Sequence, residues 1–309
     1  MNQTKKKNPL KRLLSMRGMG QVVTVTIGLI VLLVAFALIN PNFWSPTNRT
    51  NLLRQIAPIL IIGIAQSYVL ITGNIDLSIG SVVGMSTMVA ATLMSKGIMS
   101  PIPALLVTLL CCLLIGVLNG LLVAKFKLPP FIATLGTMTV ARGIAQLVNG
   151  NYNTDSIMKF YPEAAQTFKN VFYYGKTLGL YNGIWIAIIL WIVFNFLLSK
   201  TRTGRYIYAT GSNIDAARLS GVNVVSTTVI AYVVSAFCSF VVGIITCATV
   251  GQGTMDAGNS YEMYAVAASV IGGVSTLGGQ GILLGTVVGA AIWGTLQNGL
   301  QFAGGPVAI

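Results

Sequence analysis

The sequence predicts an all-α polytopic membrane protein, and three observations lead to this fold class. Of its 309 residues, 54% are hydrophobic. Only 8% are charged, against roughly 25% in soluble globular domains. Apolar runs of roughly 17 to 25 residues, long enough for a helix to cross a ~30 Å hydrocarbon core, recur along the whole chain. One membrane domain therefore fills the sequence and leaves no room for a soluble catalytic domain.

The apolar runs, separated by charged residues and by Gly or Pro breaks, predict about nine transmembrane helices. Their expected limits are 21–39, 56–72, 79–95, 103–124, 130–148, 183–199, 225–249, 262–275 and 281–303. The predicted domains are a cytoplasmic N-terminal tail at 1–20, a transmembrane domain at 21–303 and a short C-terminal end at 304–309.

Basic residues indicate the orientation of the chain. The formal net charge is +13, but the lysines and arginines form short clusters between apolar runs, which argues against nucleic acid as a partner. The first cluster includes Lys5, Lys11 and Arg17, and no small-residue cleavage site follows the run 21–39. Alternating spans place most basic residues on the side of this cluster, so the N-terminus is expected in the cytoplasm.

Two connections between the predicted spans stand out by their length. The external segment 149–182 is rich in tyrosine and phenylalanine, which either form an interfacial belt or dock a partner. The cytoplasmic loop 200–224 contains a predicted short helix. There Asn213 suits the N-cap, Asp215 the first turn, Arg218 the last turn and Gly221 the position after the helix.

Small residues in the spans predict closely packed helices. Gly116 and Gly120 stand four apart, as do Gly281, Gly285 and Gly289. The four cysteines lie inside apolar runs without C-x-x-C spacing, and the chain has no histidine. Structural packing is therefore the expected role of the cysteines, and no metal site is predicted.

Two glycine-rich breaks place polar groups near the membrane interior. The first is 73–81 (Gly-Asn-Ile-Asp-Leu-Ser-Ile-Gly-Ser) and the second is 272–281 (Gly-Gly-Val-Ser-Thr-Leu-Gly-Gly-Gln-Gly). Both are typical of discontinuous helices or tight cytoplasmic hairpins, because polar backbone at membrane depth must be buried in protein or line a wet cavity. Asp76 or Ser78 either caps the following helix or lies in a solute pathway.

Further polar side chains lie within or near the spans, where each needs a partner. The candidates for a substrate pathway are Asn74, Asp76, Ser78, Asn119, Thr134, Thr137, Arg142 and Glu262. Hydrogen bonding between helices is the alternative role for each of them. Among the acidic residues, only Asp76 and Glu262 come near the membrane, and two carboxylates at helix ends make a poor relay for ions. No Gly-x-x-x-x-Gly-Lys-[Ser/Thr] motif occurs, so the energy source is expected outside this chain.

Several motifs together resemble one known family. They are the break 73–80, Leu-Asn-Gly at 118–120, Pro-Phe-Ile-Ala-Thr-Leu-Gly-Thr-Met at 130–138, Thr-Arg-Thr-Gly-Arg-Tyr-Ile-Tyr-Ala at 201–209 and Ala-Ala-Arg-Leu-Ser-Gly-Val at 216–222. In this order, the motifs are similar to those of the permease subunits of ribose-type sugar ABC importers, which handle ribose, xylose, arabinose or galactose. These permeases belong to the branched-chain amino acid/ribose permease superfamily.

The resemblance implies a bundle that pairs with a second permease copy around a pathway in the bacterial inner membrane. It also implies an external sugar-binding protein and an ABC ATPase subunit, but no cofactor and no enzyme activity in this chain. The ATPase is expected to dock on Thr201, Arg202, Gly204, Arg205, Ala217, Arg218, Leu219 and Gly221. Amide, hydroxyl and guanidinium groups among the pathway candidates suit the hydroxyls of a neutral sugar.

One departure from the family concerns the end of the chain. Family members continue with a further span and a cytoplasmic tail, so this chain is expected to lack the last helix and to end outside. Three other classes stay open: an ion-coupled secondary sugar carrier, a sensor or scaffold, and an intramembrane enzyme. Dependence of uptake on ATP separates a secondary carrier from an importer subunit. The absence of histidine and the absence of paired carboxylates both disfavour an enzyme. The sugar itself stays open.

Overall fold

The computed structural model describes residues 19–304. Of the predicted N-terminal tail, only residues 19 and 20 lie in this range, and they begin the first described helix. Of the predicted C-terminal end, only residue 304 lies in this range. Five described helices are long and apolar enough to cross a membrane. They are α2 (Met19–Ile39), α3 (Pro46–Ile71), α5 (Pro101–Ala124), α8 (Asn182–Lys200) and α11 (Val224–Val250).

Four further helices complete the bundle, and short elements connect them. The four are α4 (Ile79–Ser95), α6 (Pro130–Leu147), α12 (Tyr261–Ile271) and α13 (Leu283–Phe302). The connecting elements are η1 (Pro41–Trp44), α7 (Pro162–Lys169), η2 (Asn170–Tyr174), α9 (Arg202–Ser212), α10 (Ile214–Leu219) and the strands β1 (Lys176–Thr177) and β2 (Leu180–Tyr181). The two strands pair antiparallel, with Lys176 opposite Tyr181. The predicted all-α class is confirmed.

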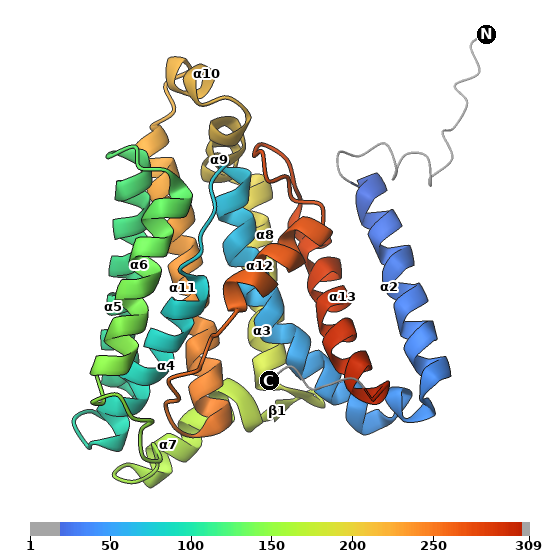
Figure 1. Ribbon diagram of the computed structural model, residues 1–309, viewed down its shortest axis with the longest axis vertical. Helices are drawn as coiled ribbons and strands as arrows, with labels where there is room; N and C mark the ends of the chain where they lie inside the picture. The colour runs from blue at the N-terminus through green and yellow to red at the C-terminus, as the bar shows by residue number, and fades with distance from the viewer. Residues whose placement is uncertain (1–18, 305–309) are drawn as a thin grey trace.

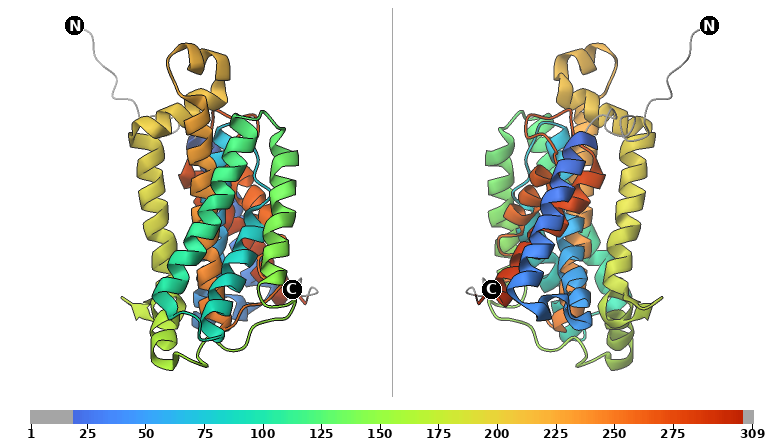
Figure 2. Two further views of the ribbon diagram at one scale, coloured as in Figure 1. Left: turned by 90° about the vertical axis from the view of Figure 1, so that its left-hand side faces the viewer. Right: turned by 90° about the vertical axis from the view of Figure 1, so that its right-hand side faces the viewer.

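The helices run between two ends of an elongated bundle (Figure 1). At one end lie α9, α10 and the turn between α5 and α6; at the other lie α7 and the β1–β2 hairpin. We call these the α10 end and the hairpin end. Side views show α10 projecting beyond the other helices (Figure 2). Helix α2 begins at the α10 end, and α13 finishes at the hairpin end.

The outer surface of the bundle is apolar. Large hydrophobic side chains are exposed along α2, α5 and α8, including Val31, Leu38, Ile102, Leu106 and Ile192. Polar residues such as Ser67, Ser86, Thr87 and Ser239 are buried inside instead, where their hydroxyls bond to backbone oxygens. This arrangement is expected where lipid surrounds the helices, because polar groups of the backbone and side chains must then find partners within the protein.

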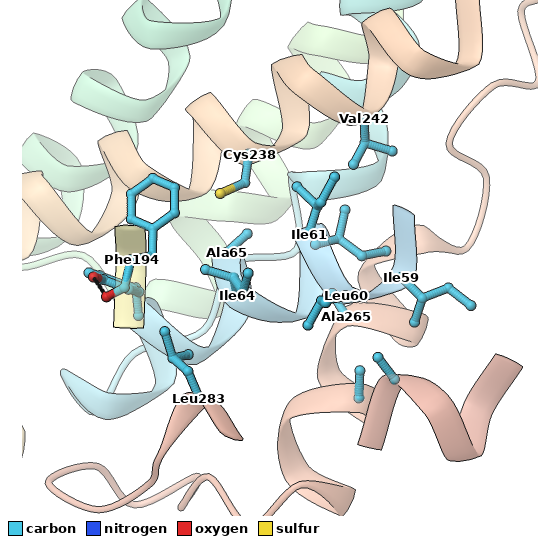
Figure 3. Close-up of a cluster of buried hydrophobic side chains, with 14 of the residues drawn as sticks. Ile59, Leu60, Ile61, Ile64, Ala65, Phe194, Cys238, Val242, Ala265 and Leu283 are labelled. Carbon is cyan, nitrogen blue, oxygen red and sulfur yellow. Dashed lines mark hydrogen bonds between the residues drawn. The ribbon is translucent and has the colours of Figure 1, made fainter. Parts of the chain in front are cut away.

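The main apolar core forms around α3, which packs against α8, α11, α12 and α13. Figure 3 shows Ile61, Ile64 and Ala65 of α3 between Phe194 of α8, Cys238 of α11 and Ala265 of α12. Cys112, Cys238 and Cys247 are buried free thiols within helices. Their burial agrees with the predicted packing role.

The expected small-residue contacts occur at several helix crossings. Gly116 and Gly120 of α5 leave no room for a Cβ atom against α11, where Val229 lies over Gly120. On α13, Gly285 has no room for a Cβ atom against the Gly272 carbonyl, and Gly289 has none against the Ala268 carbonyl of α12. Gly281, with φ of +143°, belongs to the loop before α13 and not to the helix face.

The structure differs from the expected spans in three places. Helix α3 begins ten residues before the expected 56, so Arg49 and Arg54 lie on the helix and not in an external loop. Helix α12 has only 11 residues, about 16 Å at 1.5 Å per residue, and so does not cross the membrane alone as 262–275 was expected to. The loop 200–224 holds two helices, α9 and α10, where one was expected.

We predict that Gly120→Leu lowers the thermal stability of the purified chain, because the larger side chain must displace Val229 and the α11 backbone. Overpacking of this kind costs about 1–3 kcal/mol. Gly28→Leu on the exposed side of α2, where nothing lies within 4 Å, is the matched control. Thermal unfolding in detergent, followed by size-exclusion chromatography, measures both variants. Equal melting temperatures for the two would contradict the close α5–α11 contact.

Candidate functional site

A buried polar network lies where the chain returns into the bundle between α3 and α4. The segment 72–78 is not helical; it starts with a turn at 72–73 and leads back along the bundle before α4 begins (Figure 1). Asp76, only 3% exposed, accepts hydrogen bonds at one carboxylate oxygen from the backbone N–H (2.8 Å) and Oγ (2.6 Å) of Ser78. The other oxygen accepts from Ser235 Oγ of α11 at 2.7 Å. The carboxylate therefore joins the turn to α11.

The network continues from Ser78 to two further helices. Asn119 of α5 donates from its amide to Ser78 Oγ at 2.9 Å, and Thr137 of α6 donates to the Asn119 carbonyl oxygen. Tyr232 of α11 donates to the backbone oxygen of Ile75 at 3.0 Å. Four of the predicted pathway residues thus form one continuous chain of hydrogen bonds across α4, α5 and α6.

The local sequence explains the turn. A carboxylate that accepts from the backbone N–H two residues later forms an Asx turn, which competes with regular helix and suits a helix start. Ser78 occupies the N-cap position of α4, but its side chain caps no backbone N–H. Of the two roles left open for Ser78, side-chain capping of α4 is therefore not seen; its hydroxyl links Asp76 to Asn119 instead.

A second interrupted segment, 251–260, enters the bundle between α11 and α12. Arg142 of α6 donates from Nη1 to the backbone oxygens of Met255 (3.0 Å) and Ala257 (2.9 Å). The first turn of α12 then packs on α4, where Glu262 and the backbone of Gly258 lie against Gly80. Arg142 and Glu262 thus flank this junction of the two short helices.

Asn74 and Thr134 do not join either group. Within residues 19–304 the Asn74 amide bonds only to Thr72, and Thr134 Oγ1 bonds to the Pro130 carbonyl of its own helix. Neither residue therefore shows the hydrogen bonding between helices that was the alternative role, and a place in the pathway stays a prediction for both. Ser235 and Tyr232 join the network although they were not predicted; their signal was a pair of polar groups three residues apart inside the apolar run 225–249.

The break at 272–281 is a tight hairpin at the α10 end rather than a discontinuity inside the bundle. Ser275 N–H donates to the Gln280 carbonyl at 3.0 Å, and Gly279 N–H donates to the carbonyl of Ile71 at 2.9 Å. Tyr208 of α9 donates to the Gly281 carbonyl at 2.6 Å. The hairpin consequently ties α9 to the end of α3.

The predicted capped helix exists as α10. Asn213 accepts from the N–H groups of Asp215 (3.0 Å) and Ala216 (2.9 Å), and Gly221 adopts φ of +81°. Arg218 pairs with Asp215 at 3.2 Å, and Leu219 is 90% exposed at the tip. Ala217 was expected to pack into a partner, but it is buried in this chain, so that expectation is wrong.

Helix α9 contains the remaining predicted docking residues. Thr201 caps it by accepting from Gly204 N–H at 3.3 Å, and Gly204 has no room for a Cβ atom against the Leu198 carbonyl. Arg202 and Arg205 are exposed. Thr201 and Gly204 therefore shape the α8–α9 corner, while the two arginines face outward.

Comparisons with known proteins give consistent relatives. Residues 48–309 match the family of branched-chain amino acid transport system permease components. The chain is 40% identical over 278 residues to the ribose import permease of Haemophilus influenzae, covering 89% of this chain and 84% of the relative. It is 36% identical to the galactofuranose transporter permease of Escherichia coli, covering 96% and 86%, and 32% identical to its D-allose transport system permease, covering 88% and 82%. No solved structure gives a significant match.

The apolar helices and these membrane permeases together make the chain a multi-pass membrane protein. The family match covers most of the chain, and it agrees with the motifs that first suggested the resemblance. The chain belongs to the family of branched-chain amino acid transport system permease components.

Proposed function

We propose that this chain is the membrane-spanning subunit of an ATP-driven importer for a ribose-like monosaccharide. In this proposal it pairs with a second permease copy, receives sugar from a soluble binding protein and is driven by a separate ABC ATPase. The names of its relatives, which are permeases for ribose, D-allose and galactofuranose, support a sugar as the cargo.

The observation that carries the proposal is α10. A six-residue helix whose first N–H groups are capped by Asn213 is rigid for its size, and it projects from one end of the bundle. Leu219 presents an almost fully exposed apolar side chain at its tip. An isolated large apolar group on a rigid projection suits insertion into a cleft of a partner protein.

The distribution of charge supports placing the α10 end in the cytoplasm. Lys125 and Lys127 lie in the α5–α6 turn, and Lys200, Arg202, Arg205 and Arg218 lie around α9 and α10. The hairpin end carries as many basic residues, namely Arg49, Arg54, Lys96, Lys159, Lys169 and Lys176. The excess comes from the basic cluster at 5–17, which precedes α2 in the sequence, and α2 begins at the α10 end. An excess of Lys and Arg marks the cytoplasmic side of bacterial membrane proteins.

The buried network suits a pathway for a neutral solute. Its side chains offer hydroxyl, amide and carboxylate oxygens and amide donors, the groups that satisfy sugar hydroxyls. Asp76 has no lysine or arginine within ion-pair distance in the described part of the chain. A buried carboxylate at this depth also favours a second candidate, an ion-coupled carrier, in which Asp76 binds the coupling ion.

We predict that Leu219→Asp abolishes ATP-driven uptake while the protein still inserts, because Leu219 is exposed and its replacement disturbs no internal packing. Loss of an apolar docking residue costs about 2 kcal/mol or more, roughly a 30-fold weaker association with the ATPase. Copurification of the ATPase and uptake of labelled ribose measure the effect. Leu178→Asp, equally exposed at the hairpin end, is the control for copurification. Unchanged copurification of the ATPase with Leu219→Asp would exclude α10 as the docking element.

We predict that Asp76→Asn retains ATP-dependent uptake within a few-fold of wild type. An asparagine oxygen can still accept both bonds from Ser78, and its amide can donate to Ser235. Asp76→Leu, in contrast, leaves the Ser78 and Ser235 hydroxyls without this partner, at about 1–3 kcal/mol for each unsatisfied buried group, and should lower thermal stability. Uptake assays with and without ATP depletion test the first variant. If Asp76→Asn abolishes uptake, and wild-type uptake survives ATP depletion, the ion-coupled carrier is correct instead.

The orientation makes a separate prediction. In a background without the four native cysteines, Leu178→Cys at the hairpin should react with a membrane-impermeant maleimide in intact cells. Leu219→Cys should react only after the membrane is permeabilised, in cells that lack the ATPase. The reverse labelling pattern would show that the α10 end faces outward.

A further inference from the structure

A cleft of about 260 Å³ opens at the hairpin end, away from the Asp76 network. It lies between the first half of α3, the end of α11, the start of α12, the last turns of α13 and η2. The lining residues include Arg54, Gln55, Tyr173, Tyr261, Tyr264 and Gln297. The volume is just below the roughly 300–1,000 Å³ of typical small-molecule pockets, so the cleft suits a ligand of monosaccharide size.

Aromatic rings supply the apolar part of the cleft. Tyr261 and Tyr264 of α12 stand with ring centroids 5.6 Å apart, and Trp293 of α13 lies 5.4 Å behind Tyr264. Because the rings support one another, their faces are held in place before any ligand arrives. Flat, rigid ring faces suit the C–H face of a pyranose or furanose.

Arg54 supplies fixed hydrogen-bond donors. Its guanidinium carbon lies 4.3 Å from the ring centroids of both Tyr173 and Tyr181, so two cation–π contacts hold the guanidinium in place. The edge N–H groups are the donors that remain. In the described part of the chain Arg54 forms no ion pair within 4.0 Å.

Two amides complete the polar part of the cleft. The Gln55 carbonyl oxygen accepts a hydrogen bond from Asn298 at 3.2 Å, which leaves the Gln55 NH₂ group free to donate elsewhere. Gln297, the neighbour of Asn298, also lines the cleft. No carboxylate is among the lining residues, so the cleft is unsuited to a cationic ligand.

We propose that this cleft is a carbohydrate subsite at the entrance of the permease, in which sugar hydroxyls bond to Arg54, Gln55 and Gln297 and the sugar ring packs on Tyr261 and Tyr264. The assignment of a neutral sugar rests on the proposed function. The cleft lies at the end opposite α10, which is the external end in the orientation proposed above, and so at the side from which sugar arrives.

The test uses the full chain in lipid nanodiscs and D-ribose as the probe, with saturation-transfer NMR as the readout. Gln297→Leu should weaken D-ribose binding about 3- to 10-fold, the effect of losing one or two hydrogen bonds. Gln301→Leu is the matched control, because Gln301 lies on the same helix but is exposed outside the cleft. Arg54→Gln should likewise weaken binding, while Arg49→Gln, exposed on the same helix, should not.

Three results would overturn the subsite. They are no D-ribose binding to the wild-type chain, equal binding by Gln297→Leu and Gln301→Leu, and displacement of D-ribose by inorganic phosphate, which would make the cleft an anion site. Uptake by the complete importer separates this inference from the proposed function. Normal ribose uptake with no binding in the cleft overturns the subsite alone; binding in the cleft without any ATP-driven uptake overturns the importer and leaves the subsite standing.

Discussion

The structure depends on one constraint: backbone polar groups at membrane depth must find partners inside the protein. Two segments, 72–78 and 251–260, leave helical structure within the bundle and so lose their regular partners. Tyr232 satisfies the Ile75 carbonyl of the first, and Arg142 satisfies the Met255 and Ala257 carbonyls of the second. Some of the polar side chains buried in this apolar bundle are therefore located where the helices are interrupted.

The same constraint explains why α4 and α12 are short and meet each other. Each begins after an interrupted segment rather than at the membrane surface, and their first turns pack together at Gly80. A side chain on Gly80 would collide with Gly258 and Glu262. The absence of a Cβ atom there lets two helix starts and their polar neighbours share one small region between α6 and α11.

Contacts at the α10 end link the proposed docking element to this interior. Ile71 is the last residue of α3, and Gly211 of α9 packs directly on its carbonyl group. Gly279 N–H bonds to the same carbonyl. Residue 72 then starts the segment that contains Asp76. If a partner displaces α9 and α10, the movement therefore reaches the end of α3, one residue before the interrupted segment. It is transmitted by packed backbone rather than by flexible side chains. Such rigid contacts are the means by which movement of one element shifts another.

By itself, the sequence determined the membrane class, most span positions, the capped helix with Asn213 and Gly221, and the family, because apolar length, cap chemistry and motif order are local properties. It also identified Asp76, Ser78, Asn119 and Thr137 as polar groups in need of partners. Only the tertiary structure decided which of them meet. Asp76 and Ser235 are 159 residues apart in sequence, and no local periodicity encodes that contact. The short α12 and the cleft around Arg54 were likewise decided by packing, since the surrounding helices supply the partners and walls that the local sequence lacks.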